Sequence, residues 1–344
     1  MAQFVLYLFT GCISFACAYA ALCVLARAVA PHFLDRPGGL KKHTQAVPVL
    51  GGSAIFFSLV TVLVLIRLST QFPSGTLHSL RGIILGSTLI FGMGLWDDLH
   101  KPQGLPVWAK LLIQALATGC LIYYGIVIHV FPSPWISYPL TFLWVVGLTN
   151  AFNLLDIMDG LCATQAMLCT LGLTVIALPS EFIYVNFAAL TLLGACGAFL
   201  PSNFSATRKI FLGDSGSNLL GFLIAALCLA TGYSRLTNWG FLAPLLIAFI
   251  PIADITFVVA IRLWQGKNPL KGSDDHAALR LRKAGLSDAF IVSLFASAAL
   301  ACNIGAWFLT VCPPWGVVVI LLLALGGAGW AAYALLRLGE PRAH

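Results

Sequence analysis

Charged residues are scarce in this chain. Asp, Glu, Lys and Arg make up only 9% of its 344 residues, whereas roughly a quarter of a typical soluble domain is charged. Hydrophobic residues make up 60% of the chain, and the mean hydropathy is +0.94. This composition excludes an ordinary water-soluble domain and predicts an all-α polytopic membrane protein.

Cysteine pairs at metal-binding or redox spacing are also missing. The ten cysteines all fall within or at the ends of apolar runs, and no CxxC pair is present. We expect them to pack as small hydrophobic residues, without disulfide or metal roles. Internal repeats and low-complexity tails are absent too, so residues 1–344 are expected to form a single integral-membrane domain.

Long apolar runs take the place of charge, and about 20 apolar residues suffice to cross the hydrocarbon core of a bilayer. The first run has no basic residue before it and is too long for a cleavable signal, so we expect it to be a span. The third run is short, while the fourth and ninth are long enough to tilt or to extend past the bilayer. The eleven expected spans are roughly 4–29, 49–67, 82–96, 108–130, 137–155, 161–178, 183–201, 216–233, 239–262, 288–311 and 315–336.

Basic residues indicate how these spans are oriented. With the N-terminus outside, alternating spans place all but Arg67, Arg81 and Arg235 of the 19 Lys and Arg residues on the inner side. Cytoplasmic loops of membrane proteins carry an excess of Lys and Arg. We therefore predict an outside N-terminus, a cytosolic C-terminus and cytosolic catalytic loops.

The 12 acidic residues are one-sided as well. In this topology only Glu181 falls outside, and Asp254 falls within the ninth span, where a charge is costly and where we assign it no role. The other acids lie at the inner face, mostly in short clusters. For Asp274 and Asp275, charge balance with nearby lysines is an equally good interpretation.

Asp97 and Asp98 stand side by side at the end of the third run. Two adjacent carboxylates repel each other, and a cation would relieve that repulsion at a membrane boundary. Neighbours on a helix point about 100° apart, so one of them can face a metal and the other a reacting group.

Asn153, Asp156 and Asp159 follow one another at steps of three at the end of the fifth run. If the helix continues, they form one polar stripe, which Gly160 would end. The C-terminus of a helix is electronegative, so extra carboxylates there favour a bound cation or a donor-rich ligand.

The segment FLGDSGS precedes the eighth run. Gly213 and Gly216 allow close backbone approach, and Asp214, Ser215 and Ser217 are good N-cap residues. The start of this helix is expected to face the cytosol with free N–H groups, which suits a phosphate. Capping alone would also explain Asp or Ser here, so the motif gains weight from the other clusters.

Basic residues on the same face complete a candidate site for a substrate with several phosphates. Any single lysine at such a position can instead snorkel along apolar surface. The candidates are Lys41, His43, Lys110, Lys209, Arg262, His276 and Arg280.

Five ordered segments between about residues 35 and 287 carry a resemblance to a known family. They read DRPGGLKKHTQAVPVLGG, GLWDDLHKPQGLPVWAKLLIQ, NAFNLLDIMDGL, NFSATRKIFLGDSGSNLLGF and PIADITFVVAIRLWQGKNPLKGSDDHAALRLRKAGLS. The chain resembles the polyprenyl-phosphate N-acetylhexosamine-1-phosphate transferases, which are of the glycosyltransferase 4 type. That family includes the undecaprenyl-phosphate N-acetylglucosamine-1-phosphate transferases and the phospho-N-acetylmuramoyl-pentapeptide transferases.

The resemblance implies transfer of a sugar 1-phosphate from a UDP-N-acetylhexosamine to undecaprenyl or another polyprenyl phosphate, with release of UMP. It implies Mg²⁺ as the cofactor, with Mn²⁺ as an alternative, held by Asp214 and Asp97. The implied catalytic residues are Asp97, Asp98, Asp214 and Lys110, with one Asp of the adjacent pair as the base that deprotonates the lipid phosphate. Substrate contacts are implied for Lys41, His43, Asn153, Asp156, Asp159, Lys209, Phe211, His276 and Arg280, with Phe211 stacking on uracil.

The resemblance also implies a place in the bacterial inner membrane, a lipid bilayer as the surroundings, no nucleic-acid partner, and a product that starts lipid-linked cell-envelope polysaccharide synthesis. Because relatives include dimers, a homodimer is left open. A membrane transporter is the rival class, but its acids would lie near the membrane midplane rather than at one surface.

Three departures from the family pattern bear on the sugar. Ile157 replaces the first Gly of D-G-x-D-G, and Leu40 stands where relatives have Arg. The family motif H-x-H-H-R-L is reduced to His276 and Arg280. We expect N-acetylglucosamine as the sugar, with another UDP-N-acetylhexosamine as the alternative.

Overall fold

The computed structural model describes residues 2–29, 34–35, 46–69, 76–101, 103–178, 183–233, 238–268 and 274–338. Contacts group the chain into two compact units, Met1–Gly232 and Tyr233–His344, here called the first and second units. The expectation of a single domain stays a prediction. Lys41 and His43, two of the expected substrate-contacting residues, lie outside the described residues.

The described part of the first unit contains helices and one very short antiparallel ladder. Strand β1 (Leu34–Asp35) pairs with β2 (Val47–Pro48), with Leu34 opposite Pro48. The helices are α1 (Ala2–Ala28), α2 (Gly51–Ser69), α3 (Thr76–Leu99), α4 (Val107–Tyr123), α5 (Pro134–Leu155), α6 (Leu161–Ala177), α7 (Ile183–Phe204) and α8 (Gly213–Ala230).

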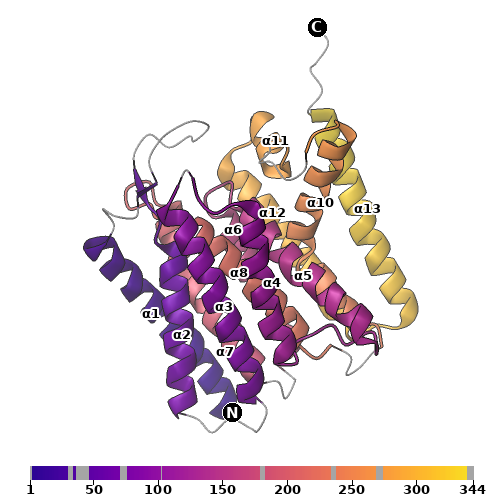
Figure 1. Ribbon diagram of the computed structural model, residues 1–344. Coiled ribbons are helices and arrows are strands. Elements are labelled where there is room, and N and C mark those ends of the chain that lie inside the picture. Colours follow the sequence, from indigo (N-terminus) through magenta and orange to yellow (C-terminus); the bar gives the residue numbers. More distant parts are fainter. Residues whose placement is uncertain are drawn as a thin grey trace. The chain divides into compact units, whose positions relative to one another are not determined.

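Helix α8 lies in the core of the first unit. Most of its length is apolar on every side, a pattern that predicts burial all round, and 16 of its 18 residues are buried. It contacts α2, α3, α5 and α6, while α1 packs against α2 and α7 (Figure 1). A Cβ on Gly216 would meet the backbone of Gly52, so the expected close approach at this glycine is confirmed.

The second unit contains a 3-10 turn and several helices in its described part. Helix α12 packs against α9, α10 and α13, and α11 contacts α10, α12 and α13. The elements are η2 (Gly240–Leu242), α9 (Ala243–Ile247), α10 (Phe249–Trp264), α11 (Ala277–Lys283), α12 (Asp288–Leu309) and α13 (Pro314–Leu338).

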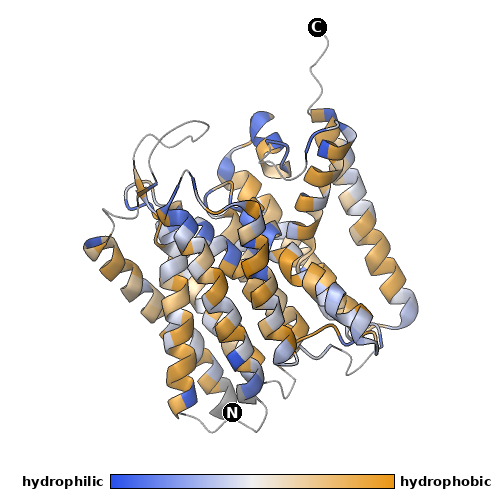
Figure 2. Cartoon of the chain, viewed as in Figure 1, coloured by the Kyte–Doolittle hydropathy of each residue, from blue (hydrophilic) through white to orange (hydrophobic). Residues whose placement is uncertain are grey.

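The apolar helices bear out the all-α membrane architecture. Among the described residues, eight helices are long and apolar enough to cross a membrane, and the bent pair α9–α10 would make a ninth span. Helices α4 and α6 are apolar but shorter, with 17 residues each. The eleven expected runs coincide with these helices, which are hydrophobic along most of their lengths and more hydrophilic at their ends (Figure 2).

Two expected span lengths were wrong, and a third span is bent. The third run is not short, because α3 has 24 residues and continues through Asp97 and Asp98. The fourth ends at Tyr123, before a turn at Gly125. The ninth is bent by 64° between α9 and α10, where Pro251 lacks the N–H that would bond back to Ile247. The orientation of the spans stays a prediction.

Candidate active site

Asp98, in the last turn of α3, caps the N-terminus of α8. Its Oδ1 accepts a hydrogen bond from the N–H of Asp214, and its Oδ2 accepts one from the N–H of Ser215, both at 2.9 Å. The Asp98 side chain is only 1% exposed. A carboxylate in this position satisfies N–H groups that have no partner within the helix and complements the positive end of the helix dipole.

Gly213 makes this contact sterically possible. Its φ of +77° is a conformation that L side chains rarely adopt, and a Cβ there would collide with the Asp98 carboxylate and with Val49. A larger residue would therefore strain the backbone and displace the capping group.

This arrangement differs from the expected one in two ways. The residue at the N-cap is Leu212, and Asp214 lies in the first turn without capping the helix. The N–H groups of Asp214 and Ser215, which we expected to be free for a phosphate, donate to Asp98. The reason is tertiary, because α3 packs against α8 and brings in a carboxylate from 116 residues earlier in the chain.

Asp97 faces the loop that joins α3 to α4. It is buried, and it accepts hydrogen bonds from the N–H of Leu105 at 2.6 Å and from Lys110 Nζ at 2.5 Å. Lys110 lies in the first turn of α4, so this ion pair joins the ends of two helices. The structure thus brings together two of the expected catalytic residues.

Lys101 was not among the expected site residues, yet it joins the same group. Its Nζ lies 2.9 Å from Asp98 Oδ1 and 3.6 Å from Asp214 Oδ1. Burial by itself would lower the pKa of Lys101, but the nearby carboxylates, first Asp98 and then Asp214, outweigh it and raise that pKa above its usual value. Its spacing of three residues from Asp98 was the signal that sequence reasoning passed over.

We call Asp97, Asp98, Lys101, Lys110 and Asp214 the acid cluster. The carboxyl groups of Asp97 and Asp214, the expected metal ligands, lie close enough for their charges to interact. Two carboxylates so close repel each other unless a proton or a cation lies between them.

The described residues contain no group of three or more His, Cys, Asp or Glu side chains that could hold a metal ion. A pair of carboxylates nevertheless fits Mg²⁺. This ion is commonly bound through one or two carboxylates together with water and substrate phosphates.

Asn153, near the end of α5, links that helix to α8. Its Oδ1 accepts hydrogen bonds from Ser217 Oγ at 2.8 Å and from Asn218 Nδ2 at 3.1 Å. These donors lie one turn beyond the residues that Asp98 caps. Asn153 therefore lies at the site, and it is held there by Ser217, an expected capping residue, and by Asn218, which the sequence did not single out.

Asp156 and Asp159 do not share a continuing helix, as the expected polar stripe required. Helix α5 ends at Leu155, and residues 156–160 form a turn. Gly160 has a φ of +76°, and a Cβ there would collide with the Phe204 ring. The helix thus breaks before Gly160, because the chain turns onto the end of α7.

The Asp156 side chain touches solvent, but it lies in a recess with many protein atoms around it. Desolvation by that protein, and then the negative charge of Asp214, raise the pKa of Asp156 to about 7. The carboxyl group therefore lies within electrostatic range of the acid cluster. A group poised near neutral pH in such surroundings is typical of a functional site.

Asp159, Lys209 and Phe211 form a neighbouring group. Lys209 Nζ lies 2.6 Å from Asp159 Oδ2 and 5.9 Å from the centroid of the Phe211 ring. The Phe211 N–H donates to the carbonyl oxygen of Pro48 at 2.8 Å, which fixes the backbone that carries this half-buried ring. Three expected substrate-contacting residues are thus close together.

His276 and Arg280 belong to the second unit. His276 Nδ1 lies 2.7 Å from Asp254 Oδ2, and the N–H of Ala277 donates to Asp254 Oδ1 at 3.0 Å. Asp254 and His276 are both buried. Asp254, to which the sequence assigns no role, is therefore paired and holds the start of α11, so its burial carries less cost than that of an isolated charge.

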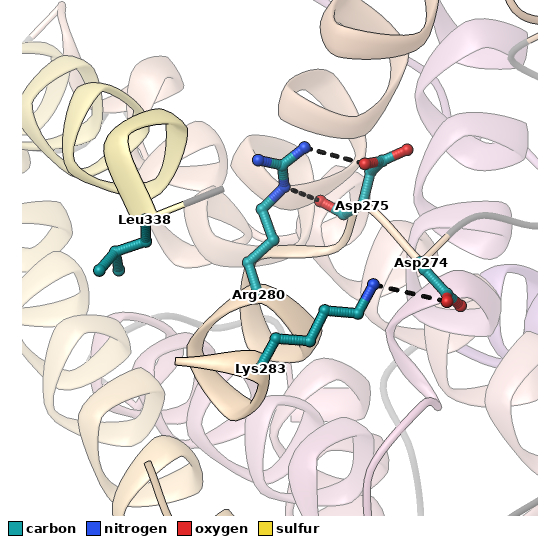
Figure 3. A pocket seen from close by; sticks show the side chains of 5 residues that line it. All are labelled: Asp274, Asp275, Arg280, Lys283 and Leu338. Atoms are coloured by element: carbon teal, nitrogen blue, oxygen red, sulfur yellow. Dashed lines mark hydrogen bonds and ion pairs between the residues drawn. The ribbon is translucent and has the colours of Figure 1, made fainter. Parts of the chain in front are cut away.

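A pocket of about 300 Å³ is lined by Asp274, Asp275, Arg280, Lys283 and Leu338. Arg280 Nη2 lies 2.8 Å from Asp275 Oδ1, and Lys283 Nζ lies 3.5 Å from Asp274 Oδ2 (Figure 3). The four charged side chains pair among themselves, which supports the charge-balance interpretation of the two acids. Arg262, another expected basic candidate, donates to the carbonyl oxygen of Asn268 at 2.9 Å.

Comparison with known proteins covers most of the chain. Residues 80–232, which contain the acid cluster, match the model of glycosyl transferase family 4. The chain is 32% identical over 264 residues to a probable undecaprenyl-phosphate N-acetylglucosaminyl 1-phosphate transferase of Bacillus subtilis, covering 74% of this chain and 71% of that protein.

Two further relatives have names that describe the same kind of transferase. The chain is 27% identical over 285 residues to a decaprenyl-phosphate N-acetylglucosaminephosphotransferase of Mycobacterium tuberculosis, covering 73% of this chain and 69% of that protein. It is 26% identical over 323 residues to an undecaprenyl-phosphate alpha-N-acetylglucosaminyl 1-phosphate transferase of Salmonella typhi, covering 87% and 84%. The chain belongs to glycosyl transferase family 4.

Proposed function

We propose that this chain transfers N-acetylglucosamine 1-phosphate from a UDP-sugar to a polyprenyl phosphate, undecaprenyl phosphate above all, and releases UMP. The observation that carries the proposal is the acid cluster, in which three aspartates and two lysines meet at the ends of α3, α4 and α8. Relatives whose names specify an N-acetylglucosaminyl 1-phosphate transferase acting on undecaprenyl phosphate support it.

The reaction brings together two anions, the lipid phosphate and the diphosphate of the UDP-sugar. Positively charged side chains that are preorganised near both anions would offset the repulsion between them and stabilise the leaving UMP. Lys101 and Lys110 supply such charges in the acid cluster, and Lys209 supplies one beside Phe211.

We propose Mg²⁺ as the cofactor, with Mn²⁺ as the alternative, held by Asp97 and Asp214. When bound, it would neutralise charge on the diphosphate oxygens. The Asp214 side chain is 25% exposed, so it can reach a ligand from the solvent side. Asp97 is held in place by Lys110 and by the N–H of Leu105.

Asp98 is proposed to act mainly by positioning Asp214. Both of its oxygens accept hydrogen bonds from the backbone of α8, and Lys101 also contacts one of them. Its role as a base stays a prediction. Little basicity is needed, because a phosphate monoester with a second pKa of about 6 is already largely ionised at neutral pH.

The nucleotide is proposed to lie against Phe211, with Asp156 and Asp159 beside it. A partly exposed aromatic ring provides a face on which a base can stack. Lys209, held between Asp159 and the Phe211 ring, would place a positive charge near a phosphate. His276 and Arg280 remain proposed sugar contacts, and Lys41 and His43 remain proposed phosphate contacts.

The membrane helices and the bacterial relatives support a place in the bacterial plasma membrane, where the product would start a lipid-linked cell-envelope polysaccharide. Another UDP-N-acetylhexosamine is the alternative donor. A homodimer is compatible with this reaction but is not required by the described site.

UMP release by the purified protein in detergent tests the proposal. UDP-N-acetylglucosamine, undecaprenyl phosphate and Mg²⁺ should together give UMP, and omission of the lipid should abolish it. A panel of UDP-N-acetylhexosamines would define the sugar. A folded protein that releases UMP from none of them would contradict the proposal.

A further inference from the structure

Asn203 lies at the end of α7 and is 6% exposed. Its Oδ1 accepts a hydrogen bond from the N–H of Gly160 at 2.6 Å, and its Nδ2 donates to the carbonyl oxygen of Ile210 at 2.9 Å. A backbone donor on one side and a backbone acceptor on the other fix the orientation of this amide group.

The two backbone groups that Asn203 joins come from different parts of the site. Gly160 closes the turn that carries Asp156 and Asp159. Ile210 lies between Lys209 and Phe211. The amide of one buried side chain therefore connects the two segments that are proposed to hold the nucleotide.

Other contacts bring the same segments together but are less constraining. The ion pair between Asp159 and Lys209 has side chains that are 36% and 30% exposed, so water and salt weaken it. The Phe204 ring lies where a Cβ on Gly160 would be, which limits how far the turn can move toward α7. Asn203 is the buried and directional link, because both of its bonds require specific geometry.

We propose that Asn203 is a positioning residue that sets the spacing between the turn of Asp156 and Asp159 and the segment of Lys209 and Phe211. This inference rests on the proposed function, since it concerns how the same site holds the uridine nucleotide. Asn203 acts through the backbone of Gly160 and Ile210 and is assigned no contact with substrate.

Steady-state kinetics of Asn203→Ala and Asn203→Asp test this role. Asn203→Asp keeps an acceptor for the N–H of Gly160 but loses the donor to Ile210. Its kinetic constants should therefore fall between those of wild type and Asn203→Ala. For Asn203→Ala, the KM for the UDP-sugar and the inhibition constant of UMP should each rise about tenfold, as expected when two buried hydrogen bonds are lost. The KM for polyprenyl phosphate should stay within about twofold of wild type, because neither segment carries the acid cluster.

Asn186→Ala is the matched control. Asn186 is a buried asparagine of the same helix, and its Nδ2 donates to the carbonyl oxygen of Ala177 at 3.2 Å and contacts Tyr7 Oη at 3.3 Å. This variant should lower thermal stability without changing either KM. A purely structural role for Asn203 would instead make its variants behave like this control.

The outcomes separate the inference from the proposed function. An active wild type whose Asn203 variants change both KM values equally, or neither, would overturn the inference alone. A wild type that neither releases UMP nor binds uridine nucleotides would overturn both. Selective weakening of nucleotide and UDP-sugar binding supports both.

Discussion

Asp98 and Asp214 are joined by one hydrogen bond but have opposite surroundings. Asp98 has a side chain that is 1% exposed, and it satisfies two backbone N–H groups, whereas the Asp214 side chain is 25% exposed. The sequence pattern alone does not distinguish these two acids. Their hydrogen-bond partners and exposure show that Asp98 holds two helices together, whereas Asp214 can reach a ligand.

Substitution by Asn should distinguish these two residues. Asp98→Asn and Asp214→Asn should each lower UMP release by at least about 100-fold, because both disturb the preorganised charges of the site. Asp98→Asn should also lower the melting temperature, because charge-assisted bonds of about 1.5–3 kcal/mol are weakened. Asp214→Asn should melt at or above the wild-type temperature. Near-normal turnover in either folded variant would refute the assignment.

Asp156 allows a prediction about pH and stability. Its pKa is about 7 in the folded protein and about 3.9 in an unfolded chain. Between these values the folded state binds more protons than the unfolded state, so the contribution of Asp156 to stability falls as the pH rises from about 4 to 7. Above pH 7, its ionised form opposes folding.

Asp156→Asn should therefore melt at a higher temperature than wild type at pH 8, and the difference should shrink toward pH 4. We expect a rise of about 1–3 °C, since solvent access to the side chain limits the effect. Thermal melting in detergent at several pH values measures it. A difference that is equal at pH 5 and pH 8 would show that the ionisation of Asp156 is not its cause.

At the scale of elements, the site is assembled where helices end. The ends of α3 and α5 meet the start of α8, and α4 begins at the same place. Helix ends leave backbone donors and acceptors without partners, so side chains from neighbouring helices complete them. Asp98, Asp97 and Asn153 are buried or partly buried here, and each forms hydrogen bonds with groups of another helix or of the loop between α3 and α4.

Gly213→Ala should test the junction between α3 and α8. The substitution combines a φ of +77° with a collision against Asp98 and Val49, and it should destabilise the protein by at least about 2 kcal/mol and lower UMP release. Gly125→Ala is the control, since Gly125 has the same φ of +77° with open space around it. That variant should show only the backbone strain of about 1 kcal/mol and keep its activity. Equal losses in the two variants would mean that the collision does not matter.

At the scale of the whole molecule, the proposed Mg²⁺ is expected to serve catalysis and not stability. Lys101 and Lys110 pair with the three aspartates, so the fold does not depend on a cation to neutralise them. A chelator should abolish UMP release while changing the melting temperature by no more than about 2 °C, and added Mg²⁺ should restore activity. A large loss of stability on chelation would indicate a structural metal instead.

Much of the architecture could be predicted from the sequence, because the apolar runs that make membrane helices are local features. The expected runs coincide with helices, and the site residues predicted within residues 97–214 do come together in the first unit. Lys101 was missed although its spacing from Asp98 is local, because only the packing of α3 against α8 brings it near Asp214. The expected stripe of Asp156 and Asp159 was wrong because α5 ends at Leu155, and the turn that follows is bonded through Gly160 to Asn203 of α7.

The sequence by itself determined that this chain is a membrane protein, and it named most of the acids and bases that the first unit brings together. Those conclusions follow from composition and from the cost of charge in a bilayer, which are properties of residues and short segments. Only the tertiary structure decided that Asp98 caps α8 and that Asn203 joins the turn before Gly160 to the segment of Phe211. A buried hydrogen-bonding group takes whatever partner the packing of distant helices brings within about 3 Å, and no local pattern specifies that partner.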